Sequence, residues 1–126
     1  MLKKKKLGFI GGGNMAEALI KGLVSASFME AKNIVASEPS QTKRDALHAA
    51  YKIKVTGDNR ELTKKCDIII LAVKPQILKA VLADIRSLVT HDKLVISVAA
   101  GVPISIMNEE LRGDTNNKFS IVRTMP

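Results

Sequence analysis

The chain has 126 residues, of which 46% are hydrophobic and 25% are charged, with 8 glycines, 4 prolines and a net charge of +8. This length is typical of one domain with one core, and the composition excludes a disordered or fibrous chain. The longest apolar run, Ile68 to Val73, is far shorter than the ~20 residues that span a bilayer. Because a signal-peptide pattern is also missing, a soluble, cytoplasmic protein without a membrane segment is expected.

Charge and cysteine content narrow the function further. Lys3 to Lys6 form one amino-terminal block of positive charge, which we interpret as a solvated leader to the first strand. No zinc-finger or RNA-binding motif accompanies it, so no nucleic-acid partner is expected. Cys66 is the only cysteine, and His48 and His91 have no partners at ligand spacing, so no metal site is predicted.

The first half of the chain alternates between strand and helix patterns. Leu7 to Ile10 is a short apolar run that ends at three glycines, and Asn33 to Ser37 is a second strand pattern. A helix is expected over about Gln41 to Ala50, and a third strand over Ile53 to Thr56. Between the first two strands a helix is predicted by apolar residues that share one face: Met15, Ala16, Leu19, Ile20, Leu23 and Val24.

The second half continues the alternation. Asp58 and Glu61 have the spacing of a helix-capping pair, and the apolar run after Asp67 is typical of a strand covered on both faces. Pro75 fits the first turn of a helix with a long apolar stripe. The expected elements are a helix over Asn59 to Lys64, a strand over Asp67 to Val73, a helix over Pro75 to Val89, a strand over Leu94 to Ala99, a helix from Pro103 to Leu111 and a strand over Phe119 to Arg123.

These elements predict the fold class. No two consecutive strands are close enough for a hairpin, so the sheet is expected to be parallel with right-handed crossovers. We predict a single α/β domain over residues 1–126, a doubly wound parallel six-stranded sheet (Rossmann fold) with strand order 3-2-1-4-5-6. Its ligand crevice lies at the carboxyl ends of strands one and four, where the strand order reverses.

The glycines after the first strand form a G-x-G-x-x-A motif from Gly11 to Ala16. The motif is informative here because it follows a predicted strand and opens a predicted helix. Gly11 permits a tight turn, Gly13 lets backbone N–H groups approach a pyrophosphate, and Ala16 allows close helix packing. The amino terminus of the following helix favours an anion, so this segment predicts a dinucleotide site.

The choice between NADP(H) and NAD(H) depends on where the second strand ends. If it ends at Ser37, the hydroxyl faces the ribose and Lys43 or Arg44 lies near a 2′-phosphate, which favours NADP(H). If it ends at Glu38, the carboxylate would bind the ribose hydroxyl and favour NAD(H). The residues favour NADP(H) and leave NAD(H) open.

Four segments in order resemble pyrroline-5-carboxylate reductase, the last enzyme of proline biosynthesis. They are Leu7 to Ala16, Leu71 to Pro75, Val95 to Val102 and Ile121 to Pro126. The resemblance implies NADP(H) as cofactor, with Ser37 and Asn59 on its 2′-phosphate side and the loop after the fourth strand against the nicotinamide. The cofactor-binding residues that the motif and the resemblance together predict are Ile10, Gly11, Gly12, Gly13, Asn14, Met15, Ser37, Asn59, Ala72, Val73, Lys74, Pro75, Val98, Ala99 and Ala100.

The resemblance also implies an oxidoreductase that reduces 1-pyrroline-5-carboxylate to L-proline with NADPH. In that family a second, helical domain follows, forms the dimer and supplies much of the substrate site. The catalytic residues are therefore not identified in this chain, and the chain alone is expected to be inactive. The alternatives are another NAD(P)-dependent dehydrogenase of hydroxyacid or prephenate type, or a non-enzymatic nucleotide-binding module.

Overall fold

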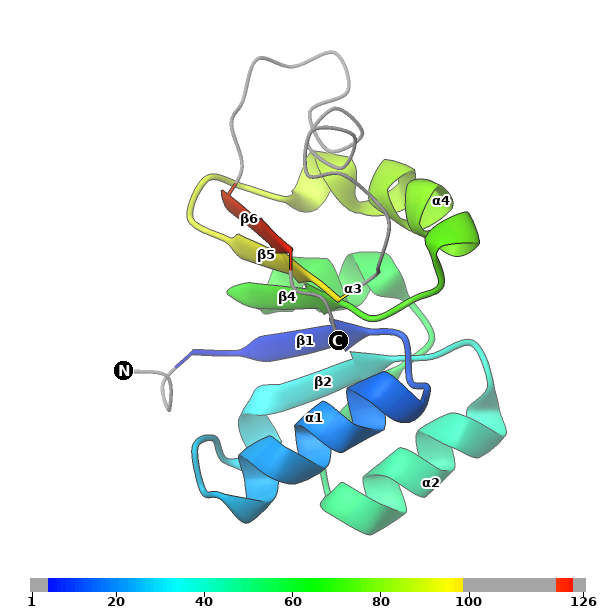
Figure 1. The fold of residues 1–126 in the computed structure, drawn as a ribbon, viewed down its shortest axis with the longest axis vertical. Helices are drawn as coiled ribbons and strands as arrows, with labels where there is room; N and C mark the ends of the chain where they lie inside the picture. Colours follow the sequence, from blue (N-terminus) through cyan, green and yellow to red (C-terminus); the bar gives the residue numbers. More distant parts are fainter. Residues whose placement is uncertain (1–4, 99–119, 124–126) are drawn as a thin grey trace.

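The computed structural model describes residues 5–98 and the backbone of residues 120–123. Strands and helices alternate through these segments, with two short 3-10 turns, η2 and η3 (Figure 1). The elements are β1 (Leu7–Ile10), α1 (Asn14–Ser25), η2 (Ala31–Asn33), β2 (Ile34–Ser37), α2 (Gln41–Tyr51), β3 (Lys54–Thr56), α3 (Asn59–Lys65), β4 (Ile68–Leu71), α4 (Pro75–Ile85), η3 (Arg86–Leu88), β5 (Leu94–Ser97) and β6 (Ser120–Arg123).

The strands form one sheet in the order β3-β2-β1-β4-β5-β6, and every pairing is parallel. β1 lies between β2 and β4, with Phe9 opposite Ala36 on one side and Ile70 on the other. The strand order therefore reverses at β1, as predicted: β2 and β3 lie on one side of it, and β4, β5 and β6 lie on the other. The α/β Rossmann-like architecture with a parallel sheet is confirmed.

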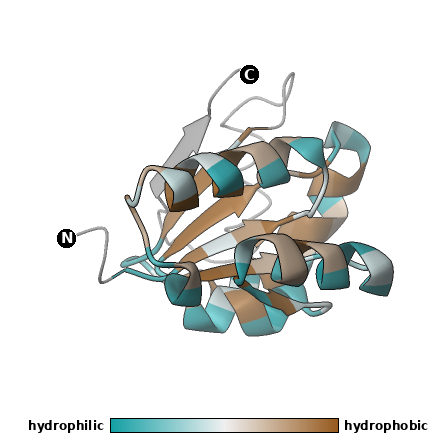
Figure 2. Cartoon of the chain, turned by 90° about the horizontal axis from the view of Figure 1, so that it is seen from below, coloured by the Kyte–Doolittle hydropathy of each residue, from teal (hydrophilic) through white to brown (hydrophobic). Residues whose placement is uncertain are grey.

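Two apolar clusters cover the two faces of the sheet. Figure 2 shows hydrophobic strands in the middle, with helices that turn their apolar sides inward and their polar sides to solvent. This arrangement is what both faces of a parallel sheet require. One cluster joins the sheet to α3 and α4 through Leu62, Leu78, Val81, Leu82 and Ile85. The other joins it to α1 and α2 through Ala16, Ile20 and Leu47.

Several elements are shorter than their sequence patterns. The strand pattern of Asp67 to Val73 yields a strand of four residues, β4, and the two residues after Leu71 line a cavity instead. The stripe that predicted a helix to Val89 contains α4 and then the 3-10 turn η3. The expected helix over Pro103 to Leu111 lies outside the described residues. No helix in the described segments is long and apolar enough to cross a membrane.

The centre of β1 approaches α3 so closely that only glycine fits there. A Cβ atom added to Gly8 would lie 2.4 Å from Leu62 Cδ2 and 2.9 Å from Cys66 Sγ. Both neighbours are fully buried. A side chain at Gly8 would therefore force the buried Leu62 and Cys66 side chains to shift.

We expect Gly8→Ala to lower the free energy of unfolding by about 1–3 kcal/mol, the usual cost of overpacking a core. Urea unfolding measures the change. Gly22→Ala is the matched control, because a Cβ at Gly22 meets no atom within 4 Å in α1 and alanine favours a helix. Unchanged stability of Gly8→Ala would contradict the described packing of α3 on β1.

Candidate functional site

A cavity of about 360 Å³ lies at the carboxyl ends of β1, β2 and β4, the position predicted for a ligand. Segments far apart in the sequence meet there: the glycine turn, the end of β2, the start of α3 and the turn before α4. The lining residues are Ile10, Gly11, Gly12, Gly13, Ser37, Glu38, Pro39, Lys43, Gly57, Asn59, Ala72, Val73, Lys74, Ile77 and Val81.

Gly11 makes the turn between β1 and α1 possible. Its φ is +107°, a left-handed conformation that disfavours side chains, and an added Cβ would lie 2.5 Å from the carbonyl oxygen of Ala72. Its N–H donates to the Ser37 carbonyl at 2.8 Å, while the Ile10 carbonyl accepts from the Ala72 N–H at 2.9 Å. The turn is thus wedged between the ends of β2 and β4.

Gly13 caps α1 and leaves its first turn open. No side chain caps this helix end, and a Cβ added to Gly13 would meet no atom within 4 Å. Unpaired N–H groups and the positive end of the helix dipole consequently face open space beside the cavity. The arrangement suits a phosphate or diphosphate group, which needs a close approach to backbone donors.

The end of β2 resolves the boundary on which the cofactor choice depends. β2 ends at Ser37, and the Ser37 hydroxyl donates to Asn59 Oδ1. Asn59 is the first residue of α3, where Asp58 caps the helix by accepting from the N–H groups of Arg60 and Glu61. Two polar side chains predicted from separate segments are therefore brought together at one wall of the cavity.

The opposite wall combines apolar side chains with one lysine. Ala72 and Val73 follow β4, and Lys74 precedes Pro75, the first residue of α4. Ile77 is 48% exposed although it is apolar, because it lines this wall instead of the core. The apolar stripe of α4 predicted both Ile77 and Val81 as core residues. Val81 is buried in the core and also borders the cavity, whereas sequence reasoning missed the place of Ile77 in the cavity wall.

Some predicted residues lie beside the cavity and do not line it. Asn14 and Met15 form the start of α1 next to Gly13, and Pro75 follows Lys74 as the first residue of α4. Val98 follows β5 and its N–H donates to the Leu71 carbonyl at 3.0 Å, which places it next to β4. Ala99 and Ala100 are outside the described residues.

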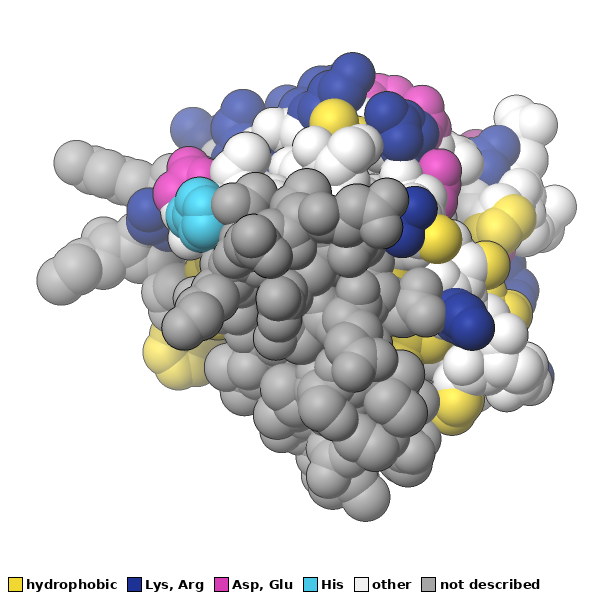
Figure 3. Space-filling model, turned by 90° about the horizontal axis from the view of Figure 1, so that it is seen from above, with side chains coloured by type: hydrophobic (Ala, Val, Ile, Leu, Met, Phe, Trp, Pro, Cys, Tyr) yellow, Lys and Arg dark blue, Asp and Glu magenta, His cyan; other side chains and the backbone are white. Residues whose placement is uncertain are grey.

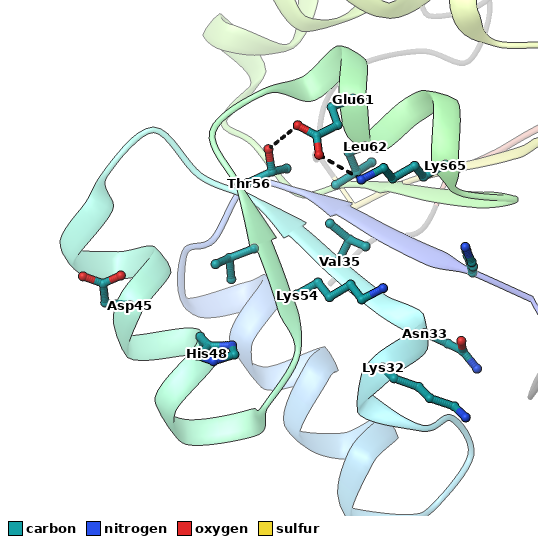
Figure 4. A pocket seen from close by; sticks show the side chains of 12 residues that line it. Lys32, Asn33, Val35, Asp45, His48, Lys54, Thr56, Glu61, Leu62 and Lys65 are labelled. Carbon is teal, nitrogen blue, oxygen red and sulfur yellow. Dashed lines mark hydrogen bonds and ion pairs between the residues drawn. The ribbon is translucent and has the colours of Figure 1, made fainter.

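A second cavity, of about 400 Å³, lies along β3 and is lined by residues of α2, β2, β3 and α3 (Figure 4). Four lysines line it, including Lys32 and Lys54, but Glu30 pairs with Lys32 at 3.1 Å and Glu61 pairs with Lys65 at 2.9 Å. These ion pairs are exposed and offset part of its positive charge. It has no glycine turn or open helix terminus, so we assign it no ligand.

Cys66 and His48 have surroundings that fit a structural role. Burial raises the pKa of the Cys66 thiol to about 11, so it stays protonated and is a poor nucleophile at neutral pH. His48 Nδ1 lies 2.9 Å from the Ile53 carbonyl, just past the end of α2.

No group of three potential metal ligands occurs within residues 5–98. On the face shown in Figure 3, Lys and Arg side chains are spread around the border with acidic side chains between them.

The sheet order, the glycine turn and the open helix terminus define a Rossmann-like domain of the dinucleotide-binding type. Residues 6–101 match the model of the family described as NADP oxidoreductase coenzyme F420-dependent, and the chain belongs to this family. The chain is 41% identical over 125 residues to a pyrroline-5-carboxylate reductase of Methanosarcina acetivorans. The aligned residues make up 99% of this chain and 45% of that protein.

Solved structures give the same result. A pyrroline-5-carboxylate reductase from Coxiella burnetii has a TM-score of 0.86 at 32% identity, covering 97% of this chain and 44% of that one. The Plasmodium falciparum pyrroline carboxylate reductase with NADP bound has a TM-score of 0.82 at 32% identity. The match covers 100% of this chain and 44% of that one. The resemblance drawn from the four motifs is confirmed, and the chain spans less than half the length of these relatives.

The contrast between two glycines provides a direct test of the site. We expect Gly13→Val to abolish dinucleotide binding and to lower the free energy of unfolding by only about 1 kcal/mol, because the space at Gly13 is empty and the one cost is a poorer helix cap. Gly11→Ala should instead destabilise the fold, because the added Cβ meets the Ala72 carbonyl. Fluorescence titration with NADPH and urea unfolding measure both effects. Wild-type affinity in Gly13→Val would show that no phosphate lies at this turn.

Proposed function

We propose that this chain is the NADP(H)-binding part of an oxidoreductase that reduces 1-pyrroline-5-carboxylate to L-proline. The observation that carries the proposal is the open amino terminus of α1 at Gly13, which faces a cavity also lined by Ser37 and Asn59. The similarity to pyrroline-5-carboxylate reductases over nearly the whole chain supports the same conclusion.

The cavity residues fit the parts of NADP(H) in one order. The backbone from Gly11 to Met15 would hold the diphosphate, and Ser37 with Asn59 would bind the 2′-phosphate side. The turn from Ala72 to Pro75, together with Val98, Ala99 and Ala100, would bound the nicotinamide half. When bound, the nicotinamide supplies the hydride that reduces the C=N carbon of the substrate. The chain's contribution is to hold one face of the nicotinamide ring in a fixed orientation toward the substrate and to exclude water.

The finer architecture belongs to the same proposal. A single doubly wound, six-stranded domain over residues 1–126 would bind the cofactor, and a separate part of the enzyme would anchor the substrate. We further propose that the intact enzyme is a cytoplasmic homo-oligomer without nucleic-acid or membrane partners. Polar groups that could protonate the imine or bind the substrate carboxylate are not assigned to any residue of this chain.

Cofactor choice is the first test of the proposal. NADPH should bind more tightly than NADH, and Ser37→Ala and Asn59→Ala should each weaken NADPH binding about tenfold with little change for NADH, since one charge-assisted hydrogen bond is lost. Thr56→Ala is the control, because this hydroxyl bonds Glu61 beside the second cavity. Equal affinities of the wild-type chain for NADPH and NADH would sink the 2′-phosphate assignment.

Turnover is the second test. The 126-residue chain should bind NADPH and yet form no L-proline at a rate near that of an intact reductase. Positioning the substrate against the hydride donor can supply roughly 7–11 kcal/mol of the barrier, and this chain has no assigned substrate anchor. Titration and a proline assay on one sample measure both properties. Rapid proline formation by this chain would show that its own loops complete the substrate site.

A further inference from the structure

Glu38 is a buried carboxylate at the cavity that the proposed function leaves without a role. It is only 8% exposed and follows the last residue of β2. Its Oε1 accepts from the Gly12 N–H at 3.2 Å, and its Oε2 accepts from the Ser40 N–H at 2.8 Å. One side chain thus joins the glycine turn to the turn between β2 and α2.

Further contacts fix the position of this carboxylate. The Glu38 N–H donates to the Thr56 carbonyl at 3.0 Å, and Arg44 Nη1 donates to the Glu38 carbonyl oxygen at 2.6 Å. The stem of Glu38 also packs beneath Gly12, where an added Cβ would lie 3.0 Å from Glu38 Cβ and Cγ. Hydrogen bonds therefore hold both the backbone of Glu38 and its carboxylate, and each carboxylate oxygen already accepts from a backbone N–H.

We propose that Glu38 is a positioning residue that fixes the glycine turn against the β2–α2 turn before the dinucleotide binds. This inference rests on the proposed function and adds a role that differs from direct ribose binding, the role expected for an acidic residue at this point of the fold. Three consecutive glycines lose much conformational entropy on ordering. A carboxylate that already holds Gly12 removes part of that cost from the binding step.

The mechanism makes a specific prediction about selectivity. NADPH and NADH share the diphosphate that lies at the glycine turn, so loss of the Glu38 carboxylate should weaken both by the same factor. If Glu38 instead bound the ribose hydroxyls directly, its removal would weaken mainly the binding of NADH. A carboxylate that only occupies the donors of an incoming phosphate would give tighter NADPH binding when removed.

The experiment measures dissociation constants for NADPH and NADH in Glu38→Gln and Glu38→Ala. Glu38→Gln keeps the buried stem and one acceptor oxygen, so we expect it to retain the fold. Its loss of dinucleotide affinity should be smaller than that of Glu38→Ala. We expect Glu38→Ala to bind both dinucleotides roughly tenfold more weakly, with an unchanged ratio between them. Glu30→Gln is the matched control, because the Glu30 side chain is exposed and forms an ion pair with Lys32, away from the cavity of the glycine turn. A selective loss of NADH, or tighter NADPH binding, would overturn the proposal.

Amide hydrogen exchange without any dinucleotide gives an independent measurement. The Gly12 and Ser40 amides should exchange faster in both Glu38 variants than in the wild-type chain, while the amides of β4 stay protected. Equal exchange rates at Gly12 and Ser40 would contradict the positioning role. If the wild-type chain binds neither dinucleotide, the proposed function fails, and the exchange result still decides whether Glu38 orders the turn.

Discussion

The site depends on one close approach of backbone to backbone at Gly11. The turn after β1 passes between the ends of β2 and β4, with its N–H bonded to Ser37 and its Cα against the Ala72 carbonyl. Only a residue without a side chain can adopt this φ in so little space. The turn leads from β1 into α1, which packs on one face of the sheet and has its amino terminus beside the cavity.

This constraint connects the fold with the chemistry of the site. The parallel sheet brings the carboxyl ends of β1, β2 and β4 to one edge, and the glycine turn keeps side chains out of the space above them. The walls then differ in character: Ser37 and Asn59 are polar, whereas Val73 and Ile77 are apolar. A dinucleotide has the same division between its phosphorylated ribose and its nicotinamide.

The sequence predicted the elements well where periodicity and glycine spacing have one physical explanation. β1 and the glycine turn were predicted at the residues where they occur, and Asn59 does open α3. Strand lengths were less accurate, because apolar residues such as Val73 continue past the strand and line the cavity. The two bonds of Glu38 were not predictable, since pattern alone does not distinguish a carboxylate that binds a ligand from one that binds backbone N–H groups.

A crystal structure of this chain with NADP⁺ tests the central claim most directly. The account predicts the diphosphate against the backbone of Gly11 to Gly13, the 2′-phosphate beside Ser37 and Asn59, and the nicotinamide near Lys74. Density for the dinucleotide in the lysine-lined cavity beside Lys54, or at any place away from the glycine turn, would contradict it.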